Sequence, residues 1–461
     1  MAQRPNILLI MTDQHRADWI GASGTGFVDT PHIDALARRG VRFARAGCSS
    51  PVCAPSRAAL ASGLLPHRLG VLHNKINFPP DCPTYFQALR KSGYRVGVVG
   101  KTDLHKADHD YGDGDLPLMY HFGFTDPHET EGKGNAARPR LEQYSEDSFA
   151  LAGPYQQYLR EHGLLDRYLA DMQSRKRFPT WHTAPSCLPA EHFHDSYIGR
   201  SACELLERMP ADRPWHLFVS FVGPHHPWDA PAAYVQRYAD KAYPPSIRDA
   251  MPEAGKPAWI RQRAAKQSFG LTTAAEMEVK RYYAAAIALI DDWVGAMTTI
   301  LERRGLDENT VVIFCSDHGE MLGDHGLLLK TLMYEGALRI PLIIADPRRP
   351  EAGVSEALVE LFDLHPTILD LAGVDYAPAK LDSRSLQPLL TGEAHEIKPF
   401  QVSLLDNCRM ICDERYKLIA SYNDRAELYN LSDDAEELHN RMEAEPEIAA
   451  ALMKQLKAAC K

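Results

Sequence analysis

Four short apolar runs, each followed by polar residues, are the feature that most constrains how this chain can fold. The runs cover residues 6–11, 95–99, 216–221 and 310–315. Continuous apolar runs of this length are typical of parallel strands that are covered on both faces. A fifth run, residues 341–345, is expected to join the same sheet. Because the carboxyl ends of parallel strands meet at one edge, the sequence predicts an α/β fold, a doubly wound mostly parallel sheet flanked by helices, with one site at that edge.

The length of the chain, 461 residues, favours two structural units. We expect a catalytic α/β domain over residues 1–375. Its region 106–190 is irregular and rich in His, Asp, Gly, Pro and Tyr, which is typical of an insertion that recognises substrate. Residues 376–461 are expected to form a smaller subdomain that ends in an amphipathic helix over 434–459. Before that helix, a small antiparallel sheet is predicted from four short stretches, residues 400–405, 408–412, 416–421 and 427–430.

Charge and cysteine usage exclude several classes of function. The formal net charge is −10, so the chain lacks the basic character of proteins that bind nucleic acid or anionic membranes. The nine cysteines are odd in number and irregularly spaced, which favours a reducing compartment. The first core strand begins almost at once, leaving no room for a signal peptide, and no apolar run approaches membrane-spanning length. We therefore expect a cytoplasmic protein, monomeric or homo-oligomeric, that draws in an anionic substrate through a local cationic pocket.

Residues 49–63 contain the side chain expected to carry the chemistry. An early proline, several strong helix formers after it and Gly63 at the end predict a short helix. Cys53 is therefore placed at a helix N-terminus, where backbone N–H groups and the helix dipole favour an anion. Arg57 follows at i+4 on the same face. This arrangement is typical of an oxyanion site, although taken alone Cys53 could be a buried thiol and Arg57 a surface cation.

Three separated motifs resemble those of one enzyme family. Cys53-Ala54-Pro55-Ser56-Arg57, continuing to Ala-Ser-Gly-Leu-Leu-Pro-His-Arg, closely resembles the signature of the type I sulfatases in the alkaline phosphatase superfamily. Thr12-Asp13-Gln14 and Ser316-Asp317-His318-Gly319-Glu320 are similar to two further elements of that family, in the right order. The resemblance covers nearly the whole chain. It implies that a maturation enzyme oxidises Cys53 to formylglycine, whose hydrated aldehyde is the nucleophile.

Asp13 and the pair Asp317-His318 each follow a strand of the predicted sheet, so they should converge near Gln14. Their donor atoms suit a divalent cation, calcium first and manganese as the alternative, whereas each Asp alone could be a strand-ending cap or a turn residue. The resemblance implies that Asp13, Gln14, Asp317, His318 and the modified Cys53 bind the metal. Gln14 and His318 stand where many sulfatases have Asp and Asn, a pattern that looks like phosphonate monoester hydrolases and some sugar sulfatases.

The resemblance also implies substrate-binding residues. Lys101 and Lys330 match the lysines that hold sulfate, and His225 matches the histidine that protonates the leaving group. Taken alone, a lysine is usually a solvated charge and a histidine between prolines usually a loop residue. The neighbouring His226 is expected to point in a different direction from His225.

One motif departs from the family pattern. The second sulfatase signature reads Gly-Lys-x-His, but here Asp103 takes the histidine position and His105 comes two residues later. Either His105 reaches the site from a shifted loop as a catalytic residue, or Asp103 contributes to substrate binding.

The implied reaction is hydrolysis of a small anionic sulfate monoester, an alkyl, aryl or sugar sulfate. Hydrated formylglycine at position 53 attacks sulfur, the metal with Arg57, Lys101 and Lys330 stabilises the equatorial oxygens, and His225 protonates the leaving alcohol. The alternative is a phosphonate monoester or phosphodiester hydrolase with the same nucleophile and manganese or zinc as its ion. A third hypothesis is a catalytically silent relative that keeps the fold for binding.

Overall fold

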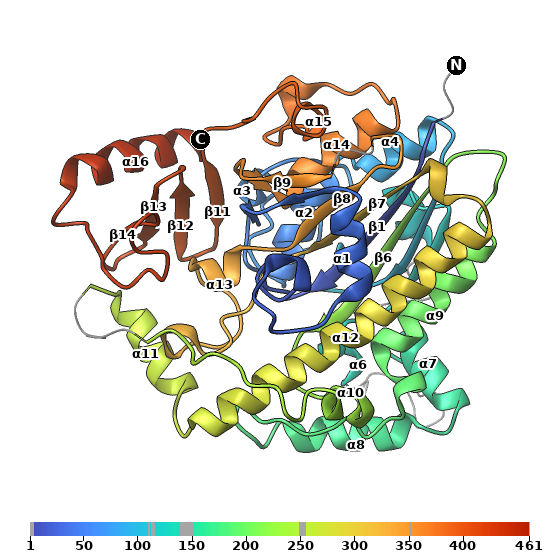
Figure 1. Ribbon diagram of the computed structural model, residues 1–461, viewed down its shortest axis with the longest axis horizontal. Helices are drawn as coiled ribbons and strands as arrows, with labels where there is room; N and C mark the ends of the chain where they lie inside the picture. The colour runs from blue at the N-terminus through green and yellow to red at the C-terminus, as the bar shows by residue number, and fades with distance from the viewer. Residues whose placement is uncertain are drawn as a thin grey trace.

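The structure is a computed structural model that describes residues 4–108, 111, 116–138, 151–248, 255–349 and 352–460. Its centre is an eight-stranded mixed sheet with helices on both faces (Figure 1), which confirms the predicted fold class. Five neighbouring strands run parallel in the order β5, β4, β6, β1, β7. Their bounds are Asp126–Glu129, Arg95–Gly100, Trp215–Pro224, Asn6–Asp13 and Thr310–Ser316. The four strands predicted first are thus β1, β4, β6 and β7.

The other end of the sheet departs from the prediction. Beyond β7 lie β8 (Leu342–Ala345), β2 (Val41–Phe43) and β9 (Gly353–Ser355). β8 is the strand expected at 341–345, but it runs antiparallel to β7, so its carboxyl end points away from the edge shared by the parallel strands. The connection, residues 317–341, contains a 3₁₀ turn and the one-turn helix α13 (Glu335–Leu338) in place of the longer helix that usually forms a parallel crossover.

The two faces of the sheet arise from the alternation of side chains along each strand. In β1, Ile7, Leu9 and Met11 enter one hydrophobic core, and Leu8 and Ile10 enter the other. Helices α2, α4 and α14 cover the first face, and α1, α9 and α12 cover the second (Figure 1). Their bounds are Cys53–Ser62, Tyr85–Lys91, Leu364–Leu371, Pro31–Arg38, His194–Glu207 and Thr273–Arg303. The parallel strands are therefore covered on both sides, as their continuous apolar runs require.

Helix α12 is the longest helix in the described part of the chain. Among the described residues it is the one helix long and apolar enough to cross a membrane, with 31 residues and a mean hydropathy of 1.5 over its most apolar stretch. Asp291 and Asp292 interrupt its apolar sequence. Within the fold 72% of that stretch is buried, as in the core helix of a globular domain.

The region 106–190 contains more regular structure than its composition predicted. Its strand β5 extends the main sheet beside β4. Its helices are α5 (Leu116–Phe122), α6 (Lys133–Ala136), α7 (Pro154–Glu161) and α8 (Leu165–Arg175). Residues 109–110, 112–115 and 139–150 of this region lie outside the described part of the chain. The assignment of this region to substrate recognition, like the domain division at residue 375, stays a prediction.

The four stretches near the C-terminus form the expected antiparallel sheet of β11 (Gln401–Leu404), β12 (Cys408–Cys412), β13 (Tyr416–Ser421) and β14 (Glu427–Asn430). The final helix, α16 (Pro446–Ala459), begins later than the predicted residue 434. The carboxylate of Asp434 instead accepts hydrogen bonds from the backbone of Leu438 and His439, which holds this segment in turns. The remaining short elements are β3 (Ala46–Gly47), β10 (Val359–Glu360), α3 (Pro66–Leu69), α10 (Ala232–Gln236), α11 (Ala258–Gln267) and α15 (Gln387–Leu390).

Candidate active site

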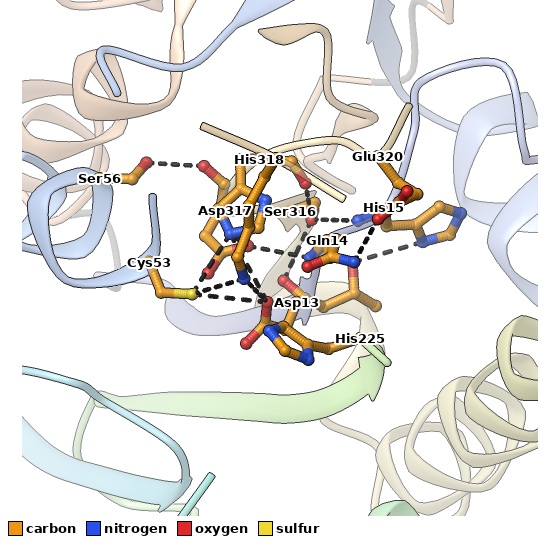
Figure 2. Close-up of polar contacts among 12 residues, drawn as sticks. Asp13, Gln14, His15, Cys53, Ser56, His225, Ser316, Asp317, His318 and Glu320 are labelled. Atoms are coloured by element: carbon orange, nitrogen blue, oxygen red, sulfur yellow. Dashed lines mark hydrogen bonds and ion pairs between the residues drawn. The ribbon is translucent and has the colours of Figure 1, made fainter. Parts of the chain in front are cut away.

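Polar side chains gather where the parallel strands end, at one edge of the main sheet. Asp13 is the last residue of β1, Lys101 follows β4, and Asp317 follows β7. His225 follows β6, and Figure 2 shows it beside Asp13. The structure therefore brings together the residues that the sequence placed at the ends of these four strands.

Helix α2 places Cys53 in the middle of this group. The helix begins at Cys53 and ends before Gly63, which has a left-handed φ of 72°. The thiol is fully buried. Its Sγ lies 3.0 Å from Nζ of Lys330, 3.3 Å from Nε2 of His318 and 3.8 Å from Oδ1 of Asp13 (Figure 2). Cys53 is thus surrounded by groups that can stabilise an anion and bind a cation.

Four buried side chains are close enough to share a metal ion. One ligand atom from each of Asp13, Cys53, Asp317 and His318 lies within 4.8 Å of the others. The Nδ1 of His318 donates to the carbonyl oxygen of Gly319 at 3.0 Å, so Nε2 keeps the lone pair that faces the cluster. Two carboxylates buried together repel each other unless cations lie between them. A divalent ion that prefers oxygen ligands fits this set of donors.

Gln14 offers a further ligand atom that the protein itself leaves unused. Its backbone N–H donates to Oδ1 of Asp317 at 3.1 Å, with a left-handed φ of 69°. Its Nε2 donates to Oε2 of Glu320 (Figure 2), which fixes the orientation of the amide. Among the described residues none pairs with the buried Oε1 of Gln14. Because an unpaired buried acceptor costs stability, this atom fits a metal ligand.

Glu320 is a residue whose role sequence reasoning missed. It stood inside a recognised motif, but no function was assigned to it. Besides holding Gln14, its Oε1 accepts from the backbone N–H of Leu322 at 3.1 Å, and burial raises the pKa of its carboxyl group. Its spacing from His318 pointed to this region, whereas its pairing with Gln14 becomes visible only in the fold.

Lys101 and Lys330 flank the thiol. The Nζ of Lys101 pairs with Oδ2 of Asp13 and lies 3.1 Å from Oδ2 of Asp103, and the Nζ of Lys330 lies 3.7 Å from Oδ1 of Asp13. Burial and Asp13 act to raise the pKa of the Cys53 thiol, but Lys101 and Lys330 outweigh them and hold it well below its usual range. Burial opposes the charge of Asp13 as well, and the same two lysines keep its pKa well below its usual value. The site therefore stabilises negative charge at position 53.

Arg57 donates hydrogen bonds to three neighbouring residues. Its Nε donates to Oδ2 of Asp317 at 2.8 Å, and its Nη1 donates to the carbonyl oxygen of Lys101 at 2.6 Å and to Oγ of Ser220 at 2.7 Å. The Arg57 side chain is 2% exposed. The guanidinium thus holds Asp317 and the Lys101 backbone in place, while its Nη2 lies 3.8 Å from Oδ2 of Asp13 and has no hydrogen-bond partner among the described residues. The contact between Arg57 and sulfate oxygens stays a prediction.

The structure separates Asp103 from His105. Asp103 lies against Lys101 and Lys106; burial opposes its charge, but these two cations hold its pKa below the usual value. His105 is buried against Glu129, the last residue of β5. Of the two alternatives, the geometry favours Asp103 as the residue beside the site, and it places His105 as a link between the loop after β4 and the end of β5.

His225 and His226 do not point in different directions. Their rings are stacked, with centroids 4.2 Å apart and planes at 20°. The Nδ1 of His225 donates to the carbonyl oxygen of His226 at 2.5 Å, so Nε2 of His225 is the nitrogen available to a ligand. Burial and the charge of Lys330 lower the pKa of His225 well below its usual value. An anion bound nearby would raise it again and favour the protonated form.

A cavity of about 530 Å³ opens over Asp13, Lys101 and His225. Its volume lies in the range of about 300–1,000 Å³ that is typical of small-molecule sites, so it has room for more than a sulfate group. Several of its lining residues were not singled out from the sequence, because none of them directly follows a strand of the sheet. These are Asn74, Lys75, Lys106, Lys133, Asn135 and Arg138.

Comparison with protein families gives two matches. The model of the family described as Sulfatase matches residues 5–374. A second model, described as the C-terminal region of N-sulphoglucosamine sulphohydrolase, matches residues 323–461. The two matches together span the described chain from β1 to α16.

Individual proteins are similar over most of their length. The chain is 28% identical over 458 residues to a choline-sulfatase of Rhizobium meliloti (strain 1021), covering 95% of this chain and 83% of that protein. It is 28% identical over 407 residues to an arylsulfatase of Clostridium perfringens, covering 84% and 78%. Among solved structures, a phosphonate monoester hydrolase from Silicibacter pomeroyi superimposes with a TM-score of 0.78 at 25% identity, covering 99% of this chain and 95% of that one.

Proposed function

We propose, on the premise that this chain belongs to the sulfatase family, a route by which its residues cleave a sulfate ester. The family match and the similar choline-sulfatase and arylsulfatase support sulfate ester hydrolysis as the activity. The substrate class is an alkyl, aryl or sugar sulfate monoester. A phosphonate monoester or phosphodiester hydrolase is the second candidate, favoured by the similarity to the Silicibacter pomeroyi structure.

Cys53 is proposed to be the site of formylglycine formation by a maturation enzyme. Two observations support this proposal: the motif around Cys53 resembles the sulfatase signature, and the side chain is buried between Lys330, His318 and Asp13. Hydrated formylglycine would supply the oxygen that attacks sulfur. The lysines that lower the pKa of the present thiol would favour the charged form of any nucleophile at this position.

Asp13, Gln14, Asp317 and His318 are proposed to hold one divalent cation together with residue 53. The unpaired Oε1 of Gln14 and the inward lone pair of His318 support this set. Oxygen ligands in the majority favour calcium, with manganese as the alternative because an imidazole also contributes. When bound, the cation would neutralise the two carboxylates and help to stabilise charge on the reacting group.

The remaining steps are carried by side chains of this chain. Lys101 and Lys330 bind the sulfate oxygens, and Arg57 keeps Asp317 and the Lys101 backbone in place. His225 donates a proton from Nε2 to the leaving alcohol while its Nδ1 stays bonded to the His226 carbonyl oxygen.

One observation carries the proposal: four potential ligand atoms converge within 4.8 Å at the N-terminus of α2. The test is to express the protein with a formylglycine-generating enzyme, determine the mass of the peptide around residue 53, and compare hydrolysis of 4-nitrophenyl sulfate with that of a phenylphosphonate monoester. We expect an aldehyde at residue 53 and a preference for the sulfate. Preference for the phosphonate selects the second candidate, and no turnover by matured, metal-loaded protein selects a silent relative.

Compartment and assembly are further parts of the proposal. The nine cysteines are unpaired thiols in the described structure, which supports a reducing compartment and hence a cytoplasmic location. Cell fractionation tests the location. Light scattering distinguishes a monomer from a homo-oligomer.

A further inference from the structure

We infer that the alcohol of the substrate carries a second anionic group, such as a carboxylate or another sulfate, and that Lys75, Lys106 and the amide of Asn74 bind it. The inference rests on the sulfate ester hydrolysis proposed above. It narrows the substrate class from sulfate esters in general to esters with two separate negative charges.

The charges around the cavity are unbalanced. Among its described lining residues Asp13 is the one carboxylate, whereas five side chains are cationic: Lys75, Lys101, Lys106, Lys133 and Arg138. The chain as a whole has a formal net charge of −10, so this excess of cations is not a general property of the protein. A cavity lined by one sign of charge concentrates ligands of the opposite sign.

Lys133 is already used to hold the loop that carries His225. Its Nζ donates to the carbonyl oxygen of His225 and to Oδ1 of Asp229, each at 2.9 Å, and the side chain is 5% exposed. Lys133 is therefore a positioning residue with its own buried counter-charge. The anion-binding capacity of the outer cavity has to come from other lysines.

Lys106 shares the carboxylate that neutralises it with a second lysine. The carboxylate of Asp103 pairs with Lys106 and also lies 3.1 Å from Nζ of Lys101. Lys101 in turn pairs with Asp13, which lies beside Lys330 as well. Along this chain of contacts the ammonium groups outnumber the carboxylates, so positive charge remains when each carboxylate has been paired.

Asn74 and Lys75 place a donor and a further cation next to the catalytic helix. Oδ1 of Asn74 accepts from the backbone N–H of Ala54 at 3.0 Å, which ties this segment to the first turn of α2 and leaves the Nδ2 hydrogens as donors. Among the residues that the structure describes, none pairs with the ammonium of Lys75, which is exposed. The cation has therefore no internal counter-ion in the described protein.

The order of exposure shows where the second anion would lie. Lys101 is buried beside Cys53, Lys106 is half-buried, and Lys75 is exposed. The scissile sulfate is held at the buried end by Lys101 and Lys330. A neutral alcohol would leave Lys75 without a counter-charge, and a cationic alcohol would be repelled by Lys75 and Lys106.

Three sugar sulfates that share one scissile group test this inference. Glucosamine 6-sulfate, N-acetylglucosamine 6-sulfate and glucosamine N,6-disulfate carry an ammonium, a neutral amide and an anionic sulfamate at the same position. Their dissociation constants are measured by calorimetry on the full-length, calcium-loaded Cys53→Ala protein, which cannot turn them over. We expect the disulfate to bind at least about tenfold more tightly than the amine at low salt, with a difference that shrinks as salt screens the charges.

Lys75→Glu in the same protein should reduce the ratio of disulfate to N-acetyl affinity by about five- to tenfold. Lys91→Glu is the matched control, because it makes the same change of charge at an exposed residue that does not line the cavity. Lys91 is the last residue of α4 and precedes Ser92, whose carbonyl oxygen accepts a hydrogen bond from Arg4. Equal affinities for the three sugars, tightest binding of the amine, no measurable binding of the disulfate, or an unchanged ratio in Lys75→Glu would overturn the inference. Turnover of 4-nitrophenyl sulfate by the matured enzyme is measured separately, so failure of the proposed function is distinguishable from failure of the subsite.

Discussion

The Nζ of Lys330 lies 3.0 Å from the Sγ of Cys53, on a loop that is left-handed on both sides of the lysine. Leu329 and Thr331 have φ angles of 67° and 66°, which non-glycine residues adopt only when the surroundings hold them. Arg263 on α11 supplies that support, because it donates to the carbonyl oxygens of Lys330 and Thr331 and to Oγ1 of Thr331. A residue outside the strand ends therefore fixes the position of Lys330.

Arg263→Ala should lower kcat for 4-nitrophenyl sulfate by about 10- to 100-fold, because a misplacement of about 1 Å costs rate of this order. The metal content should stay unchanged, since Arg263 contacts the Lys330 loop and not the ligands. Steady-state kinetics and metal analysis of the same preparation provide the measurement. Arg261→Ala, an exposed arginine on the same helix, is the control. A loss of metal, or equal effects in both variants, would contradict the positioning role of Arg263.

Asp317→Asn should abolish metal binding and activity. The substitution removes one of two buried carboxylates from the ligand set and leaves the Nε of Arg57 with a weaker partner at 2.8 Å. Removing one member of a buried ion pair costs about 3–5 kcal/mol of stability, so the variant should also unfold at a lower temperature. Elemental analysis measures the bound metal, and thermal unfolding measures the loss of stability. Retention of a full equivalent of metal in Asp317→Asn would rule this residue out as a ligand.

His225→Ala should matter more for a poor leaving group than for a good one. General acid catalysis contributes about 10²–10⁴-fold, so that loss is expected on an alkyl or sugar sulfate and far less on 4-nitrophenyl sulfate, whose leaving group departs without a proton. The measurement is kcat/KM on both substrates.

The stacking of His225 on His226 determines which His226 variant can serve as the control for His225→Ala. His226→Ala would remove the ring whose centroid lies 4.2 Å from that of His225, whereas His226→Phe keeps an aromatic ring there and removes the titratable group. His226→Phe should retain the wild-type ratio of rates on the two substrates. If His226→Phe shows the dependence on leaving group instead, the proton comes from that residue.

Local sequence signals predicted the elements that build the site. A continuous apolar run identifies a buried strand, and Gly63 with the helix formers before it identifies the helix at Cys53. The direction of a strand could not be predicted in this way, because the run that forms β8 is as apolar as its parallel neighbours and yet runs antiparallel to β7. The later start of α16 has a similar cause, because Asp434 holds the preceding residues in turns.

The pairing of charged residues could not be predicted from local signals. The sequence placed Arg57 and His105 near the site, but their partners Asp317 and Glu129 are brought to them by the sheet. The same holds for the orientation of Gln14, which depends on Glu320. A motif therefore indicated which residues gather at the site, and the fold determined which of them face the cavity and which of them hold others in place.

The buried carboxyl group of Glu131 should make the stability of the protein depend on pH. Burial raises its pKa from 4.5 to about 7, although it accepts hydrogen bonds from the backbone N–H groups of Gln156 at 2.8 Å and Tyr155 at 3.2 Å, at the start of α7. Since the folded state favours the protonated form, the associated stability is fully present below about pH 4.5 and is lost as pH rises through about 7. A shift of this size corresponds to about 3 kcal/mol.

Glu131→Gln should remove this dependence, because the amide does not ionise and keeps a carbonyl oxygen for the shorter of the two hydrogen bonds, from the N–H of Gln156. We expect the free energy of unfolding of the wild-type protein to fall between about pH 5 and about pH 8 by more than that of the variant, and the variant to be the more stable protein at about pH 8. Denaturant unfolding at the two pH values measures the difference. Glu161→Gln is the control, because Glu161 is an exposed carboxyl group at the end of α7. The stability of this variant should depend on pH as that of the wild type does. Parallel pH profiles for wild type and Glu131→Gln would show that the Glu131 carboxyl is already ionised in the folded protein without a cost to its stability.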